Sequence, residues 1–179
     1  MFSRTNQLIL GLAVLAAVIG GIVEHSPQQS AQAPSTLIGR SLPAITLADL
    51  DGHMHALSDY RGHRVLLNLW ASWCAPCLRE MPALQKAQDN FGEQGAIVVG
   101  IAMDEAVRVR RFLADHPVNY PILLGDQGLN DTSLKLGNSR QVLPYSILID
   151  ADGSILATHE GQLSDTTLNQ WLAAPGQPH

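Results

Sequence analysis

Long apolar runs and amphipathic segments alternate along the middle of the chain. The runs 65–70 and 96–102 are almost continuously apolar, as expected for strands that are covered on both faces of a sheet. In the segments 78–91 and 104–116, apolar residues recur at the spacing of one helix face. A strand, a helix, a second strand and a second helix in this order predict an α/β domain.

A hairpin is predicted ahead of the first long run. Ile45 and Leu47 alternate with polar or small neighbours, Asp51-Gly52 is a turn signal, and residues 53–56 return. His53 and His55 fall on one face of the returning strand and offer imidazole ligands. Histidines on an exposed hairpin usually bind nothing, so the sequence predicts no metal site here.

Shorter elements follow the second predicted helix. Asp104 is predicted to cap that helix, Pro117 to stop it, and Ser164 to cap the last helix, which buries Leu168, Trp171 and Leu172. The remaining predicted elements are strands at 121–124, 145–149 and 154–158 and a short helix at 131–136.

The N-terminal residues 1–25 are predicted to be a membrane anchor or signal segment. Arg4 precedes an apolar run from Leu8 to Val23, which lies between a signal-peptide core and a full membrane span in length. The cleavage-like Ala31-Gln32-Ala33 is far from this run and is followed by Pro34. We therefore predict an uncleaved single-pass anchor in the cytoplasmic (inner) membrane with the domain in the periplasm. The alternative is a soluble periplasmic protein after cleavage.

Composition separates three further segments and excludes one class of partner. Residues 26–36 are rich in Gln, Ser, Ala and Pro and predict a flexible linker, followed by a folded domain at 37–175 and a tail at 176–179. The chain is 46% hydrophobic, which suffices for a sizeable core, and its net charge of -5 argues against nucleic acid as a partner.

The two cysteines carry the clearest chemical signal. Cys74 and Cys77 form a Cys-x-x-Cys at the point where the run 65–70 gives way to a helix. A cysteine at a helix start meets unpaired N–H groups and the positive end of the helix dipole, which favour the reactive thiolate. A disulfide that closes so short a loop removes little entropy from the unfolded chain and so stabilises the fold only slightly. Structural zinc would need further ligands, so a redox pair is the better interpretation.

The flanking residues resemble TlpA/ResA-like membrane-anchored thiol-disulfide oxidoreductases of the thioredoxin superfamily. The resemblance is carried by the segment 68–82, NLWASWCAPCLREMP, and by Leu143-Pro144 before the strand at 145–149. It spans about residues 37–175. It implies a thioredoxin-like fold, with a central mixed sheet flanked by helices, an N-terminal β-hairpin and a central strand-helix insert between 102 and 142.

The resemblance also assigns roles to individual residues. Cys74 is the expected nucleophile, exposed and acidic, and Cys77 the buried resolving thiol. Trp73 is expected to shield the disulfide and join the docking surface, with packing in the core as the alternative. Leu143 and Pro144, joined by a cis bond, would lie beside Cys74 and pair with an incoming peptide. Glu80 has two interpretations: a favourable acid in the first helical turns, or an acid that manages protons near the thiols.

The implied function is reduction of disulfides in exported proteins, with no cofactor beyond the dithiol. An uncharged Ala75-Pro76 pair between the cysteines favours a reducing protein. The resemblance implies a transmembrane electron donor of the DsbD or CcdA kind and allows apocytochrome c, in cytochrome c biogenesis, as substrate. A disulfide oxidase or isomerase and a thiol-dependent copper-binding module remain alternatives. A peroxiredoxin is disfavoured because no separate peroxidatic cysteine precedes the pair.

Overall fold

The protein is described by a computed structural model, which covers residues 37–129 and 131–173. The predicted anchor, linker and tail (residues 1–25, 26–36 and 176–179) lie outside these ranges. Among the described residues, no helix has both the length and the apolar character needed to cross a membrane.

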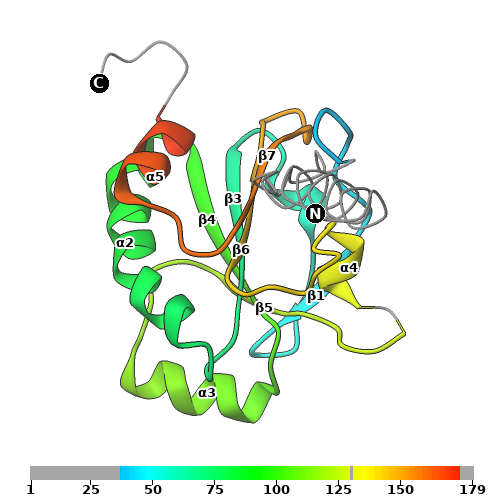
Figure 1. Ribbon diagram of the computed structural model, residues 1–179, viewed down its shortest axis with the longest axis vertical. Coiled ribbons are helices and arrows are strands. Elements are labelled where there is room, and N and C mark those ends of the chain that lie inside the picture. Colours follow the sequence, from blue (N-terminus) through cyan, green and yellow to red (C-terminus); the bar gives the residue numbers. More distant parts are fainter. Residues whose placement is uncertain (1–36, 130, 174–179) are drawn as a thin grey trace, which may run out of the picture. The chain divides into compact units, whose positions relative to one another are not determined.

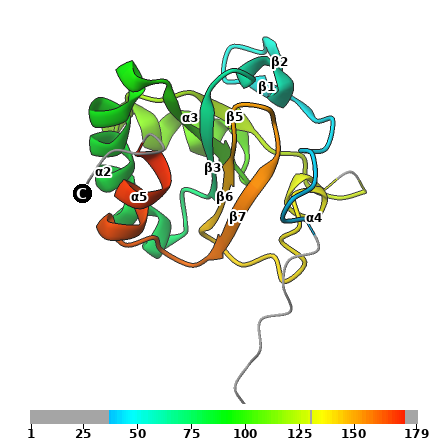
Figure 2. The ribbon, with the colours of Figure 1, turned by 90° about the horizontal axis from the view of Figure 1, so that it is seen from above.

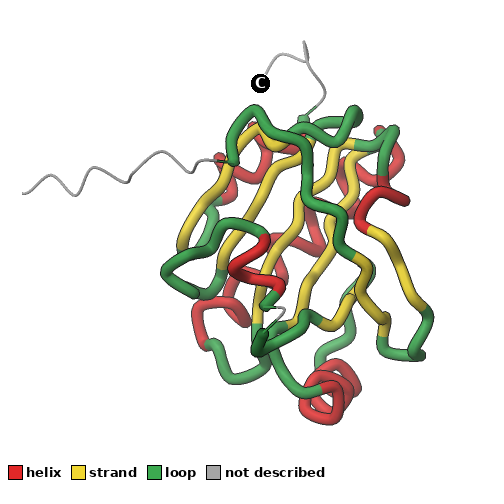
Figure 3. Tube along the Cα trace, turned by 90° about the vertical axis from the view of Figure 1, so that its right-hand side faces the viewer, coloured by secondary structure: helices red, strands yellow, loops and turns green. Residues whose placement is uncertain are grey.

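A mixed sheet of seven strands forms the centre of the domain, with the strand order β2-β1-β5-β4-β3-β6-β7 (Figures 1 and 3). Strand β3 pairs in parallel with β4 and antiparallel with β6, and β4 pairs in parallel with β5. The strands are β1 (Thr46–Asp49), β2 (Met54–Ala56), β3 (Arg64–Trp70), β4 (Ala96–Ala102), β5 (Ile122–Leu124), β6 (Tyr145–Ile149) and β7 (Ile155–Glu160).

Helices cover both faces of the sheet. Figure 2 shows α2, α3 and α5 on one side of it and α4 on the other. Their bounds are α2 (Ala75–Phe91), α3 (Ala106–Asp115), α4 (Thr132–Lys135) and α5 (Asp165–Leu172), with 3₁₀ turns η1 (Leu57–Tyr60) and η2 (Gly92–Gln94).

Two apolar clusters, one on each face, stabilise this arrangement. Leu66 and Val98 pack toward α2 and α5, whereas their neighbours Leu67 and Val99 pack on the opposite side with Leu57. Successive side chains of a strand point to opposite faces, so a continuous apolar run supplies both clusters. The predicted central mixed sheet is therefore confirmed.

The predicted hairpin is also confirmed, and it joins the main sheet. β1 pairs antiparallel with β2 and, on its other side, antiparallel with β5. Strand β5 and helix α4 form the predicted insert between β4 and β6. Asp131 caps α4 by accepting a hydrogen bond from the N–H of Leu134, and Gly137, with φ 83°, follows the helix.

One predicted helix cap is wrong. The N-cap of α3 is Glu105, whose side chain makes no capping bond. Asp104 lies one residue earlier and is buried, and its carboxylate accepts hydrogen bonds from the N–H and the hydroxyl of Ser72. Its Oδ2 atom thus binds the loop that leads to Cys74, while its Oδ1 atom accepts a hydrogen bond from the N–H of Glu105 at 2.8 Å without occupying the cap position.

Candidate active site

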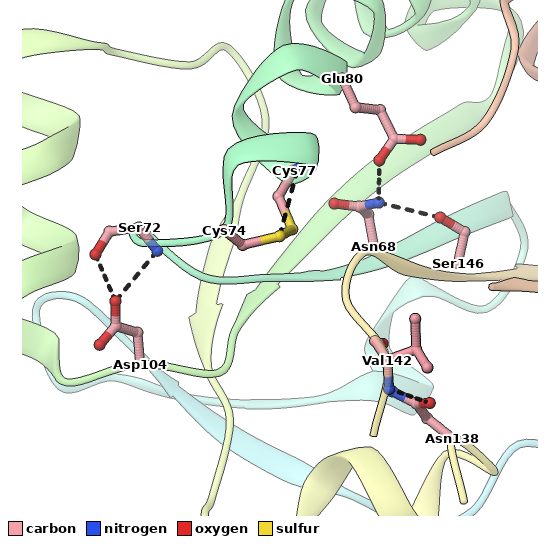
Figure 4. Close-up of a disulfide and its surroundings, with 9 residues drawn as sticks. All are labelled: Asn68, Ser72, Cys74, Cys77, Glu80, Asp104, Asn138, Val142 and Ser146. Atoms are coloured by element: carbon pink, nitrogen blue, oxygen red, sulfur yellow. Dashed lines mark hydrogen bonds between the residues drawn. A yellow bond between two sulfur atoms is a disulfide. The ribbon is translucent and has the colours of Figure 1, made fainter. Parts of the chain in front are cut away.

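The redox pair lies where β3 ends and α2 begins (Figure 4). Cys74 and Cys77 form a disulfide, with 5.3 Å between their Cα atoms. Cys74 is the N-cap of α2, and the N–H of Cys77 donates to its sulfur at 3.3 Å. A first-turn N–H directed at this atom is the contact that would stabilise a Cys74 thiolate. The predicted position of Cys74 at the helix start is confirmed.

The prediction that Cys74 is exposed is wrong for this oxidised state. Cys74 is 5% exposed and Cys77 1%, so the order of exposure is as predicted but both residues are buried. Both cysteines belong to the apolar cluster that packs around α2, which covers them from solvent. Trp73, in contrast, is 65% exposed next to the pair, which excludes core packing as its role.

Glu80 lies in a buried polar network one helical turn beyond Cys77. One carboxylate oxygen accepts a bond from the N–H of Leu163 at 2.6 Å, and the other accepts one from the Asn68 side-chain amide at 3.1 Å. The same amide nitrogen of Asn68 donates to the Ser146 hydroxyl at 3.0 Å (Figure 4). Glu80 is 0% exposed. A favourable charge in the first helical turns does not by itself account for a buried carboxylate that accepts two hydrogen bonds.

Burial shifts the ionisation of this network. Desolvation raises the pKa of Glu80, against the opposing effect of the hydrogen bonds from Leu163 and Asn68. Burial also raises the pKa of Tyr120, and the charge of Glu80 adds to that effect. A buried carboxyl group with a raised pKa can hold or release a proton closer to neutral pH than a surface carboxyl group can.

The raised pKa predicts how stability depends on pH. Because the folded protein holds the Glu80 proton more tightly than the unfolded chain, Glu80 favours folding most below its ordinary pKa of 4.5. That contribution is lost as the pH rises from about 4.5 through the raised pKa of the folded state. Denaturant unfolding of the oxidised wild type and Glu80→Gln should show the wild type losing stability relative to the variant over this window. A constant difference would contradict the raised pKa.

The loop before β6 reaches the same site. The Leu143–Pro144 bond is cis, as predicted, and Leu143 packs against the cluster that contains both cysteines. Val142, the residue before Leu143, is held by the side chain of Asn138. The Asn138 amide oxygen accepts a hydrogen bond from the Val142 N–H at 3.0 Å, and its amide nitrogen donates to the Val142 carbonyl at 2.8 Å. Asn138 is fully buried and also donates to the Ser133 hydroxyl of α4. The insert thus fixes the backbone that leads to Leu143 (Figure 4).

Removing the hydrogen bonds that hold the loop before β6 should weaken substrate binding more than it changes the reactivity of the Cys74 thiol. For Asn138→Ala we expect a several-fold higher KM for a protein disulfide and an unchanged rate of Cys74 alkylation by a small reagent in the reduced protein. Loss of the buried amide should also cost about 1–3 kcal/mol of stability. Asn119→Ala, at an exposed position with hydrogen bonds to α2, is the control. Equal KM values in the two variants would contradict the role of Asn138.

Several residues of the site carried little or no signal in the sequence. Asn68 and Ser146 are polar residues within buried strands, and such residues need hydrogen-bond partners. That requirement indicates a polar network without naming Glu80 as its centre. Asn138 lies in a loop whose sequence gives no indication of its burial.

The comparisons with known proteins agree with this geometry. The AhpC/TSA family model matches residues 38–158. The chain belongs to the AhpC/TSA family. Thiol-disulfide oxidoreductase ResA of Geobacillus kaustophilus is 30% identical over 175 residues, which are 94% of this chain and 96% of that protein. Together with the Cys74–Cys77 pair, this relationship identifies the protein as a thiol-disulfide oxidoreductase.

Solved structures show the same fold. The thioredoxin domain of thiol-disulfide oxidoreductase BVU-2223 from Bacteroides vulgatus has a TM-score of 0.64 and 26% identity, covering 76% of this chain and 98% of that one. A secreted thiol-disulfide isomerase from Corynebacterium glutamicum has a TM-score of 0.66 and 27% identity, covering 73% and 82%. This member of the AhpC/TSA family has only two cysteines in its 179 residues, so the pair itself carries the redox chemistry.

Proposed function

We propose that this AhpC/TSA family member reduces disulfides of exported proteins, with Cys74 as nucleophile and Cys77 as resolving thiol. The observation that carries the proposal is the sulfur of Cys74 at the N-cap of α2, facing the N–H of Cys77. The intervening Ala75-Pro76 adds no cation that would stabilise the thiolate further. When the thiolate is only moderately stabilised, the reduced form of the protein is also only moderately stable, so its reduction potential is low and it donates electrons readily.

The exchange takes two steps. The Cys74 thiolate attacks a substrate disulfide, a mixed disulfide forms, and the other substrate sulfur leaves as a thiolate. Cys77 loses its proton and attacks the Cys74 sulfur, so that the Cys74–Cys77 disulfide forms and the second substrate thiol is released. Glu80, one turn beyond Cys77 and buried with a raised pKa, is the group that we propose takes part in this proton transfer.

The exposed Trp73 and the loop at Leu143-Pro144 are the proposed substrate-binding elements. Trp73 offers a large apolar surface beside the disulfide. The N–H and carbonyl of Leu143 could pair with an extended peptide in the manner of an added strand. Both features suit recognition of a protein chain more than that of a small thiol.

The proposed location is the periplasmic face of the inner membrane. The apolar residues 8–23 would anchor the protein, and a transmembrane donor of the DsbD or CcdA kind would return electrons to the Cys74–Cys77 disulfide. The structurally similar thiol-disulfide isomerase from Corynebacterium glutamicum is a secreted protein, which agrees with an exported location. On the resemblance to the TlpA/ResA group, apocytochrome c is the substrate that we would test first.

Trapping with a Cys77→Ala variant tests the proposal. This variant can form the mixed disulfide but cannot resolve it, so its partners should accumulate on Cys74 and be identified by mass spectrometry. Exported proteins with paired cysteines are the expected captives, and apocytochrome c among them would support the finer assignment. A Cys74→Ala, Cys77→Ala variant is the control. Captives shared with that control, or none, would contradict the proposal.

A further inference from the structure

Away from the redox pair, acidic and imidazole side chains converge on the β1–β2 hairpin. Asp49 ends β1, and His53 and His55 lie on the returning segment. The Nδ1 atom of His53 is 3.3 Å from Asp49 Oδ2, and the Nε2 atom of His55 is 2.9 Å from the same oxygen. Two ring nitrogens from different positions along the chain therefore meet at one carboxylate oxygen.

The other carboxylate oxygen of Asp49 is already used. Oδ1 accepts hydrogen bonds from the backbone N–H groups of Asp51 and His53 at 2.8 and 2.9 Å. These bonds fix the carboxylate across the turn and leave Oδ2 directed at the two imidazoles. The Asp51 carboxylate is also close, because ligand atoms of Asp49, Asp51 and His53 lie within 4.8 Å of one another.

We propose that this hairpin binds one divalent transition-metal cation, such as Zn²⁺ or Cu²⁺, through Asp49, His53 and His55. Imidazole nitrogens select zinc, copper or nickel over calcium and magnesium, which prefer oxygen ligands alone. Around tetrahedral zinc, ligand atoms at about 2.0–2.2 Å from the metal lie about 3.3–3.6 Å apart. Asp49 Oδ2 lies 3.3 Å from His53 Nδ1 and 2.9 Å from His55 Nε2, close to this separation. The His53 side chain is 77% exposed, so its ring has room to turn until both imidazoles face one ion.

The surroundings suit a fourth ligand and an entry path. Asp51 or water can complete the coordination. Asp49, Asp51 and His55 line an open groove of about 420 Å³, which gives the ion and its water access from solvent. The two carboxylates supply two negative charges, enough to neutralise a divalent cation. The site uses no atom of Cys74 or Cys77, so it is independent of the proposed reductase function.

Zinc titration of the untagged, full-length protein in its disulfide form tests the inference, because the cysteines then offer no thiolate. We expect the wild type to bind one Zn²⁺ by calorimetry and His53→Ala to bind at least tenfold more weakly. The His53 side chain is 77% exposed, so its removal should leave the fold intact. His63→Ala, which removes another exposed histidine, should bind like the wild type.

Two further measurements make the outcome decisive. NMR of the imidazole nitrogens should show His53 Nδ1 and His55 Nε2 shifting with Zn²⁺ while His63 does not, and Asp49→Asn should weaken both shifts. Cu²⁺ titrated in the same way should bind at the same residues and more tightly. The absence of saturable binding of either ion, or equal losses in His53→Ala and His63→Ala, would overturn the proposal.

Discussion

Replacing Cys74 with serine should lower the rate of protein-disulfide reduction by at least about 10³-fold, because the nucleophile itself is removed. A serine hydroxyl at the same helix start cannot attack a disulfide sulfur at neutral pH. Reduction of an oxidised protein disulfide, such as those of insulin, by the reduced enzyme measures this loss directly. The fold should persist, since serine can also cap α2.

Cys77→Ser is the matched variant. It should lose turnover as well, yet still form a mixed disulfide with substrate, which Cys74→Ser should not do. Mass spectrometry of the quenched reaction separates the two. If Cys74→Ser instead formed the mixed disulfide through Cys77, the roles assigned to the two thiols would be reversed.

Replacing Glu80 with glutamine should slow the resolving step by about 10²-fold, within the range of general acid–base catalysis. Glutamine has nearly the same shape, and its carbonyl oxygen can still accept a hydrogen bond from Asn68 or Leu163, but it cannot exchange a proton. The loss should therefore depend on pH, with the variant lacking the ionisation that belongs to Glu80. Stopped-flow measurement of mixed-disulfide decay from pH 5 to 9 provides the profile.

Glu93→Gln controls for a change in overall charge, since Glu93 is exposed in η2. Its pH profile should match that of the wild type. If the decay rate of Glu80→Gln followed the same pH dependence as the wild type and differed only by a constant factor, the role of Glu80 would be structural only.

The framework of the fold could be predicted from the sequence because it rests on strong local patterns. The runs at 65–70 and 96–102 are covered on both faces by neighbouring elements. A strand of this kind is apolar throughout, so it could be recognised without an alternation of apolar and polar residues. Asp104 shows where such reasoning fails. An acidic residue just before a helix suits the cap position, but the tertiary fold brought Ser72 within hydrogen-bond distance of its carboxylate.

The site was predictable to the extent that its chemistry is local. Cys74 and Cys77 are defined by the turn in which they lie, and helix α2 begins after Cys74 as expected. Glu80 is different, because its burial depends on Asn68 and on Leu163, which is 83 residues away. No spacing along the chain encodes such a contact, and so its two interpretations could be separated only in three dimensions.

The direction of electron flow is the central claim, and the reduction potential of the Cys74–Cys77 couple tests it most directly. The purified protein would be equilibrated with graded dithiothreitol or glutathione buffers, and its oxidised fraction would be counted by thiol alkylation and mass measurement. A disulfide reductase predicts a value near ~-270 mV, in the range of thioredoxin. A value near ~-120 mV, in the range of strong oxidants, would contradict the account and make the protein a disulfide oxidase.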